Sequence, residues 1–139
     1  YKDKKMKKIA ALMAGLIILG FSAVSAQAAD TVYELRTYTT NEGKLDDLNA
    51  RFRDHTIGLF EKHGISSVGY WTPVDTPNTL IYVIKHNSRD AAAQSWKAFI
   101  EDPAWAVVAK ESNANGAILA VAPESVFMNA TAYSLDMLK

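Results

Sequence analysis

The chain has no cysteine among its 139 residues. Disulfides and thiol catalysis are therefore excluded together, so stability has to come from packing or from association between subunits. The sequence also lacks a glycine-rich phosphate loop, a nucleophilic serine motif, a carboxylate dyad and a His-Glu-x-x-His motif, and nothing in it supports nucleotide chemistry or hydrolysis. The three histidines have no metal-site spacing, and we expect no metal and no cofactor; because one histidine suffices to hold haem, a haem ligand stays open.

The longest apolar run extends only from Ile9 to Phe21. It follows the basic segment Met6-Lys7-Lys8 and precedes Ala26-Gln27-Ala28, the three-part pattern of a secretory signal peptide. The run is short for a membrane span, so we predict cleavage near Ala28 and a periplasmic or secreted bacterial protein without stable membrane insertion. An uncleaved anchor is the alternative, and mass spectrometry of the processed chain would distinguish the two. Residues 1–28 then comprise a short remnant upstream of Met6 and the signal peptide.

A strong charge of either sign is missing from the rest of the chain. Residues 29–139 carry 10 Lys and Arg against 14 Asp and Glu, a net charge of about −4. Without a cluster of cations this segment is a poor ligand for nucleic acid or for anionic membranes. Its length suits one domain with one core, and we assign 29–139 to a single domain.

The pattern of the remaining chain predicts two helical regions among four strands. Spacings of three and four residues predict the first helix, which Gly64 ends, and Ser88 caps the second. The order β-α-β-β-α-β is typical of a ferredoxin-like α+β fold with a four-stranded antiparallel sheet. The predicted strands lie within Thr31–Thr40, Ser66–Pro73, Thr79–His86 and Glu124–Ala132; the first helix has an apolar stripe of Leu45, Leu48, Phe52, His55 and Leu59; and the second is followed by a short helix over Pro103–Ser112.

Both faces of the strand "TLIYVIKH" are apolar, and the helices can cover only one of them. The other face predicts a homodimer in which two sheets close over each other. Glu34, Arg36 and Tyr38 share one face of the first strand, and Leu35 lies on the other. We expect Leu35 to pack under the helices and the Glu34-Arg36-Tyr38 face to line a cavity enclosed by the partner subunit.

Three segments in register resemble the NIPSNAP family. They are "VYELRTYTTNEGKLDDL", "HTIGLFEKHGISSVGYW" and "RDAAAQSWKAFIEDPAW", and the similarity runs from about Val32 to about Glu111. The resemblance implies a dimeric α/β-barrel related to antibiotic-biosynthesis monooxygenases and haem-degrading enzymes. For most bacterial members it implies no established activity.

Glu34 and Arg36 match the Glu-x-Arg strand of that family. Buried charges must be paired, so one interpretation is a structural ion pair. The other is a site in which Arg36 binds an anionic or carbonyl oxygen while Glu34 orients it or moves a proton. His55 is the second catalytic candidate, since a histidine on an apolar stripe is either a hydrogen-bonded core residue or a general base.

Aromatic residues complete the predicted site. We expect Tyr38 to line the cavity, and Tyr82 as well if the register between the two strands brings it there. Trp71 is expected to form an aromatic wall beside Arg36 for a flat organic molecule. His63 and His86 lie at the ends of elements, where we expect exposure to solvent. Three function classes remain: a binding protein for a small organic ligand, a cofactor-free monooxygenase or isomerase, and a structural or interaction protein whose cavity is filled.

Overall fold

The computed structural model describes residues 30–135, so the predicted signal peptide and its cleavage site lie outside the described residues. No helix within 30–135 has the length and apolar character needed to cross a membrane. The elements run in the order β1 (Val32–Thr39), α1 (Leu45–Arg51), the π-helical turn η1 (Phe52–Thr56), α2 (Ile57–Lys62), β2 (Ser66–Trp71), β3 (Thr79–His86), α3 (Arg89–Glu101), α4 (Pro103–Ser112), β4 (Glu124–Met128) and α5 (Ala132–Leu135).

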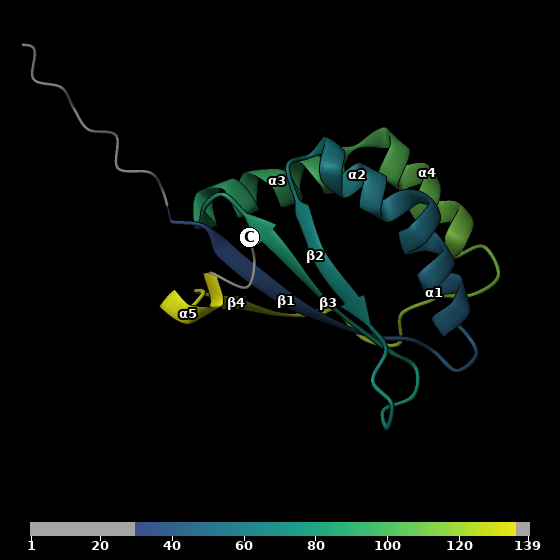
Figure 1. Cartoon of the computed structure of the whole chain (residues 1–139). Coiled ribbons are helices and arrows are strands. Elements are labelled where there is room, and N and C mark those ends of the chain that lie inside the picture. The colour runs from purple at the N-terminus through teal and green to yellow at the C-terminus, as the bar shows by residue number, and fades with distance from the viewer. Residues whose placement is uncertain (1–29, 136–139) are drawn as a thin grey trace, which may run out of the picture.

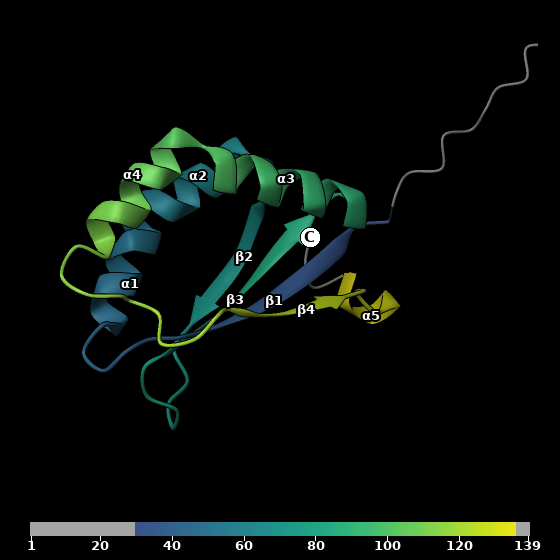
Figure 2. The same cartoon turned by 180° about the vertical axis from the view of Figure 1, so that it is seen from behind.

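The four strands form one antiparallel sheet in the order β2-β3-β1-β4. The helices from α1 to α4 arch over one face of the sheet, and the short α5 lies beyond the opposite face (Figures 1 and 2). This is the ferredoxin-like arrangement that the order of elements predicts, and that prediction is confirmed.

Local sequence explains where the helices begin and end. The Ser88 side chain accepts a hydrogen bond from the Ala91 amide at 2.9 Å and caps α3, as predicted. Asp102 caps α4 in the same way, with Pro103 at the first helical position, where its missing N–H has no cost. Gly64 adopts a positive φ of 78° after α2, a conformation that glycine tolerates best.

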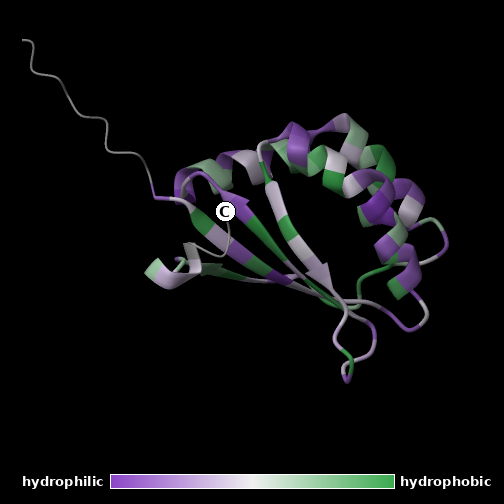
Figure 3. Cartoon of the chain, in the orientation of Figure 1, coloured by the Kyte–Doolittle hydropathy of each residue, from purple (hydrophilic) through white to green (hydrophobic). Residues whose placement is uncertain are grey.

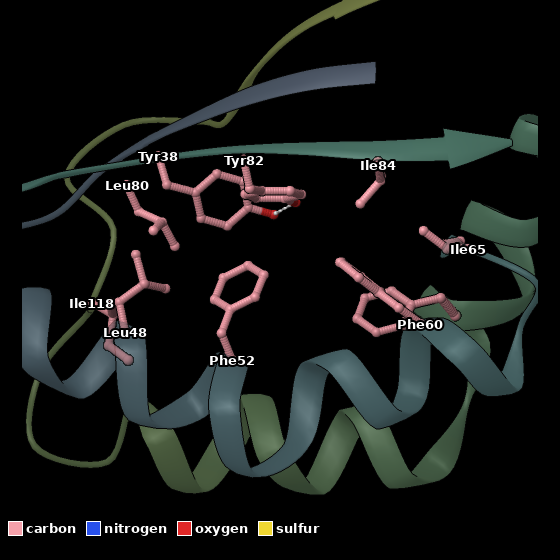
Figure 4. Close-up of a cluster of buried hydrophobic side chains, with 10 residues drawn as sticks. Tyr38, Leu48, Phe52, Phe60, Ile65, Leu80, Tyr82, Ile84 and Ile118 are labelled. Atoms are coloured by element: carbon pink, nitrogen blue, oxygen red, sulfur yellow. Dashed lines mark hydrogen bonds between the residues drawn. The ribbon is translucent and has the colours of Figure 1, made fainter. Parts of the chain in front are cut away.

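The core lies between the sheet and the helices. Tyr38, Leu80, Tyr82 and Ile84 project from the strands toward a layer of side chains from the helices (Figure 4). Hydrophobic residues occur along the strands as well as on the helices (Figure 3). The helix side contributes Leu48, Phe52, Phe60 and Phe99, with Ile65 and Ile118 from adjoining segments.

The two faces of β1 are the reverse of what we predicted. Tyr38 belongs to the helix-covered core, and Glu34 accepts a hydrogen bond from Trp96 of α3, so the face with Glu34, Arg36 and Tyr38 lies under the helices. Leu35 therefore points away from them. Alternation separates two faces but does not say which one is covered, and here the polar face is covered because its charged groups are paired.

The first helix also departs from the predicted stripe. Its register holds through Leu48 and Phe52, and then η1 inserts the wider π turn. Thr56 and Phe60 consequently take the buried positions, while His55 is exposed. The prediction that His55 lies on the apolar stripe is wrong because a π turn rotates every later residue around the helix axis.

Candidate functional site

Glu34 is the centre of a buried polar cluster. Its side chain is 1% exposed, and donors from three other elements converge on it. Oε1 accepts from Arg36 Nη1 at 2.8 Å and from Ser125 Oγ at 2.7 Å. Oε2 accepts from Trp96 Nε1 at 2.7 Å and hydrogen-bonds His86 Nε2 at 2.8 Å. All the acceptor positions of the carboxylate are therefore used.

This cluster decides the charge state of Glu34. Burial alone would raise the pKa of the carboxyl group, but hydrogen bonds from His86, Ser125, Trp96 and Arg36 outweigh it and lower the pKa to about 2. An ionised carboxylate only accepts hydrogen bonds, so His86 Nε2 must carry the proton in their contact. His86 Nδ1 has no hydrogen-bond partner among the described residues. Glu34 is thus ionised, and Arg36 balances its charge within the cluster.

Arg36 lies between this cluster and open space. Its guanidinium is 4.4 Å from the Trp96 ring centroid and 5.6 Å from that of Tyr38, so it is stacked as well as ion-paired. Tyr38 in turn accepts a hydrogen bond from the Tyr82 hydroxyl at 3.2 Å. Burial raises the pKa of Tyr82, which keeps this phenol neutral and able to donate.

A pocket of about 480 Å³ opens beside Arg36. One wall carries Trp96, Phe99 and Trp105, whose rings touch in sequence with centroid separations of 5.7 and 4.6 Å. Arg36, Tyr38 and Arg51 also line the pocket, with Arg36 next to Trp96 and Arg51 next to Trp105, and residues between α4 and β4 complete the lining. The remaining lining residues are Ile100, Ala109, Asn113, Ala117, Leu119 and Pro123.

Four of the six predicted site residues come together on this face. Glu34, Arg36, Tyr38 and Tyr82 are neighbours, and β1 pairs with β3 so that Arg36 is opposite Tyr82. The expected enclosure is different, because the helices of the same chain cover the face instead of a partner subunit.

Two predicted residues lie elsewhere. His55 lines a separate hollow of about 310 Å³ between the first helix and α4. Trp71 is 54% exposed and pairs with Ile81 on the other face of the sheet, where its ring lies over Gly69. The predicted aromatic wall beside Arg36 is therefore formed by Trp96 and Trp105 and not by Trp71.

Three contributors were missed by the sequence interpretation. His86 is 1% exposed, and the expectation that it is solvent-exposed is wrong. It is the last residue of β3 and lies four residues after Tyr82, so alternation along the strand places both side chains on the same face. This alternation could have identified His86 from the sequence. Trp96 lies one turn before Phe99 on α3, a spacing that is typical of ordinary core residues. Nothing in the sequence singled out Ser125.

The fold defines the class first: this is a ferredoxin-like α+β domain with one four-stranded antiparallel sheet. The chain belongs to the NIPSNAP family, whose profile matches residues 33–135. A comparison with curated protein sequences gave no match.

Solved structures agree with this assignment. A NIPSNAP-like domain protein from Burkholderia xenovorans is 13% identical, with 74% of this chain and 87% of that chain covered and a TM-score of 0.65. A NIPSNAP family protein of unknown function from Agrobacterium tumefaciens is 22% identical, with coverage of 76% and 92% and a TM-score of 0.63. SnoaB, a cofactor-independent oxygenase from Streptomyces nogalater, is 17% identical, with coverage of 74% and 95% and a TM-score of 0.51.

Proposed function

We propose that this NIPSNAP-family protein binds a small, flat organic molecule in the pocket between the sheet and the helices α3 and α4. The observation that carries the proposal is a pocket of about 480 Å³ that Trp96, Phe99 and Trp105 line together with Arg36 and Tyr38 of β1. Small-molecule sites are typically apolar hollows of this size with a few fixed polar groups.

The Glu34 cluster gives the pocket a rigid polar end. In the proposal, Glu34 positions Arg36 and Trp96 and moves no proton, since its four hydrogen bonds leave no free acceptor position. Arg36 is held at 2.8 Å by Glu34, and its guanidinium carbon lies near the rings of Trp96 and Tyr38. Groups that are already ordered lose little conformational entropy when a ligand binds.

The three tryptophans provide the test. Trp96 and Trp105 line the pocket, and Trp71 lies on the other face of the sheet as an internal reference. We expect millimolar 2-naphthamide, a neutral aromatic probe, to shift the indole N–H signals of Trp96 and Trp105 in a ¹H–¹⁵N spectrum and to leave that of Trp71 in place. Shifts at Trp71 alone, or at none of the three, would contradict the proposal.

A matched pair of substitutions on α4 locates the binding. Ala109 lines the pocket, and Ala109→Leu adds volume there. Ala106 on the same helix is exposed, and Ala106→Leu adds the same volume in solvent. We expect Ala109→Leu to weaken binding of the probe about tenfold or more and Ala106→Leu to leave it within about twofold. Equal effects would place the probe elsewhere.

A cofactor-independent oxygenase is the second candidate, favoured by the fold likeness to SnoaB. Arg36 and the Tyr38 hydroxyl both line the pocket and offer donors for a substrate oxyanion. The measurement is oxygen uptake with an anthrone, a polycyclic ketone whose enolate reacts with dioxygen. Uptake above that of the Arg36→Gln variant would support this function, and equal rates would exclude it for that substrate.

A further inference from the structure

Arg51, the last residue of α1, is a buried cation that also lines the pocket. It is 7% exposed, and its guanidinium lies 5.3 Å from the centroid of Trp105. Its one hydrogen bond to a described residue is long, 3.4 Å from Nη1 to Ser112 Oγ, and its Nε has no partner there. Among residues 30–135 no carboxylate oxygen lies within 4.0 Å of its nitrogens.

Acidic residues near Arg51 do not neutralise it. Asp47, Asp54 and Glu111 line the hollow on its other side. Asp47 is paired with Lys44 at 3.2 Å and Asp54 with Arg53 at 2.8 Å. Burial lowers the pKa of Arg51, but a guanidinium stays charged in proteins. The charge of Arg51 is thus desolvated without a bonded anion.

Arg36 provides the comparison within the same pocket. Both arginines are stacked on an indole, Arg36 on Trp96 and Arg51 on Trp105, at the two ends of the aromatic wall. Arg36 is neutralised by Glu34. Asn113, another polar residue of the lining, carries no charge, and its side chain donates to the Ala109 carbonyl and accepts from the Ile118 amide. Arg51 is therefore the group of the lining that lacks a counter-charge.

We propose that the ligand is an organic anion, a flat aromatic body with one carboxylate or sulfonate, and that Arg51 binds this acidic group. The inference rests on the pocket being a small-molecule site, as proposed above. It adds the chemical class of the ligand: an anion at Arg51 supplies the missing counter-charge, while its rings lie along Trp96, Phe99 and Trp105.

The test compares 2-naphthoate with 2-naphthamide, which share a ring system and differ in charge. Binding is measured from the Trp96 and Trp105 indole signals in wild type, Arg51→Gln and the control Arg53→Gln. Arg53 is exposed, lies two residues away and carries the same charge. We expect wild type to bind naphthoate about tenfold or more tightly than naphthamide. Arg51→Gln should lose this preference, so that its affinities for the two probes agree within about twofold, and Arg53→Gln should keep it.

The outcomes separate the two proposals. If both probes bind equally in wild type and Arg51→Gln, the pocket stands as a small-molecule site and the anion inference fails. If neither probe shifts Trp96 or Trp105, the proposed function fails as well.

Folding gives an independent readout. Removing an unpaired buried charge does not remove a stabilising pair, so we expect the melting temperature of ligand-free Arg51→Gln to be equal to or above that of wild type. A clear decrease would make Arg51 a structural residue and overturn the inference. Arg51→Lys keeps the charge, so we expect it to retain part of the preference for naphthoate. If this variant loses the preference completely while it still binds naphthamide, a purely electrostatic contact is contradicted.

Discussion

Glu34 lies beneath the helices with donors from His86, Trp96, Ser125 and Arg36 in place of water. His86, Trp96 and Ser125 belong to three different elements, so their hydrogen bonds to this one carboxylate connect β1 with β3, α3 and β4. A carboxylate in such surroundings favours the folded state only while it is ionised, because a proton would remove one acceptor position from a cluster that uses all of them.

The acid stability of the protein should depend on this residue. The pKa of Glu34 falls from 4.5 to about 2 on folding, which corresponds to about 3 kcal/mol of stability. Since the folded-state pKa is the lower one, this contribution is complete above about pH 5 and is lost as the pH falls toward 2. We expect Glu34→Gln to lower the free energy of unfolding by about 2–4 kcal/mol at pH 7, and this deficit to shrink between pH 5 and pH 2.5.

Urea denaturation at several pH values measures this difference, with Glu42→Gln as the control. Glu42 is exposed, and its substitution should change stability by less than about 0.5 kcal/mol. A deficit for Glu34→Gln that stays constant down to pH 2.5 would show that packing, and not ionisation, is what the glutamate contributes.

At the scale of single residues, the sequence predicted membership of the site better than its orientation. Glu34, Arg36 and Tyr38 were grouped by alternation, which depends only on backbone geometry. Their direction was predicted wrongly because the apolar Leu35 was expected to pack under the helices. The four hydrogen bonds that hold Glu34 there instead come from residues up to 91 positions away in the chain. Such partners have no local signal.

The element with the largest departure from its predicted form is the first helix. The π turn of η1 moves the buried positions from the expected His55 and Leu59 to Thr56 and Phe60. The Thr56 hydroxyl donates to the Arg51 carbonyl at 3.2 Å, five residues earlier, and so helps to satisfy the wider turn. Periodicity of apolar residues finds a helix but cannot reveal one extra residue in a turn, because both registers fill the stripe with acceptable side chains.

Substitutions at adjacent positions check this register. Thr56→Val keeps the shape and removes the hydroxyl, leaving a buried carbonyl with one partner fewer, and we expect a loss of about 1 kcal/mol. His55→Ala removes an exposed side chain and should change stability by less than about 0.5 kcal/mol. Thermal or urea unfolding measures both changes in stability. A larger loss for His55→Ala than for Thr56→Val would instead indicate that the helix keeps the regular stripe, with His55 buried.

For the whole molecule, the face of the sheet opposite α1 to α4 is covered only in part, by the segment around α5. Leu35, Ile81 and Val83 face outward from its central strands, and β2 and β4 extend the surface with exposed Val68, Trp71 and Val126. A single domain seldom leaves so continuous an apolar surface in water. The strand "TLIYVIKH" predicted the apolar character of both faces, whereas only the structure identifies which residues of β1 and β4 share the open one.

We propose that two copies of the chain cover this face by packing their sheets together around a twofold axis. Val126→Glu tests this, because the twofold axis places the new charge in the interface twice. Val126 is 56% exposed in one chain, and the control Val107→Glu changes a residue on α4 that is 53% exposed on the opposite layer. Light scattering after size exclusion should give a dimer for wild type and Val107→Glu and a monomer for Val126→Glu at micromolar concentration.

Because the proposed small-molecule pocket is formed between the sheet and helices of one chain, the Val126→Glu monomer should still bind the naphthyl probes. Loss of both dimer and binding would instead mean that the pocket depends on the partner.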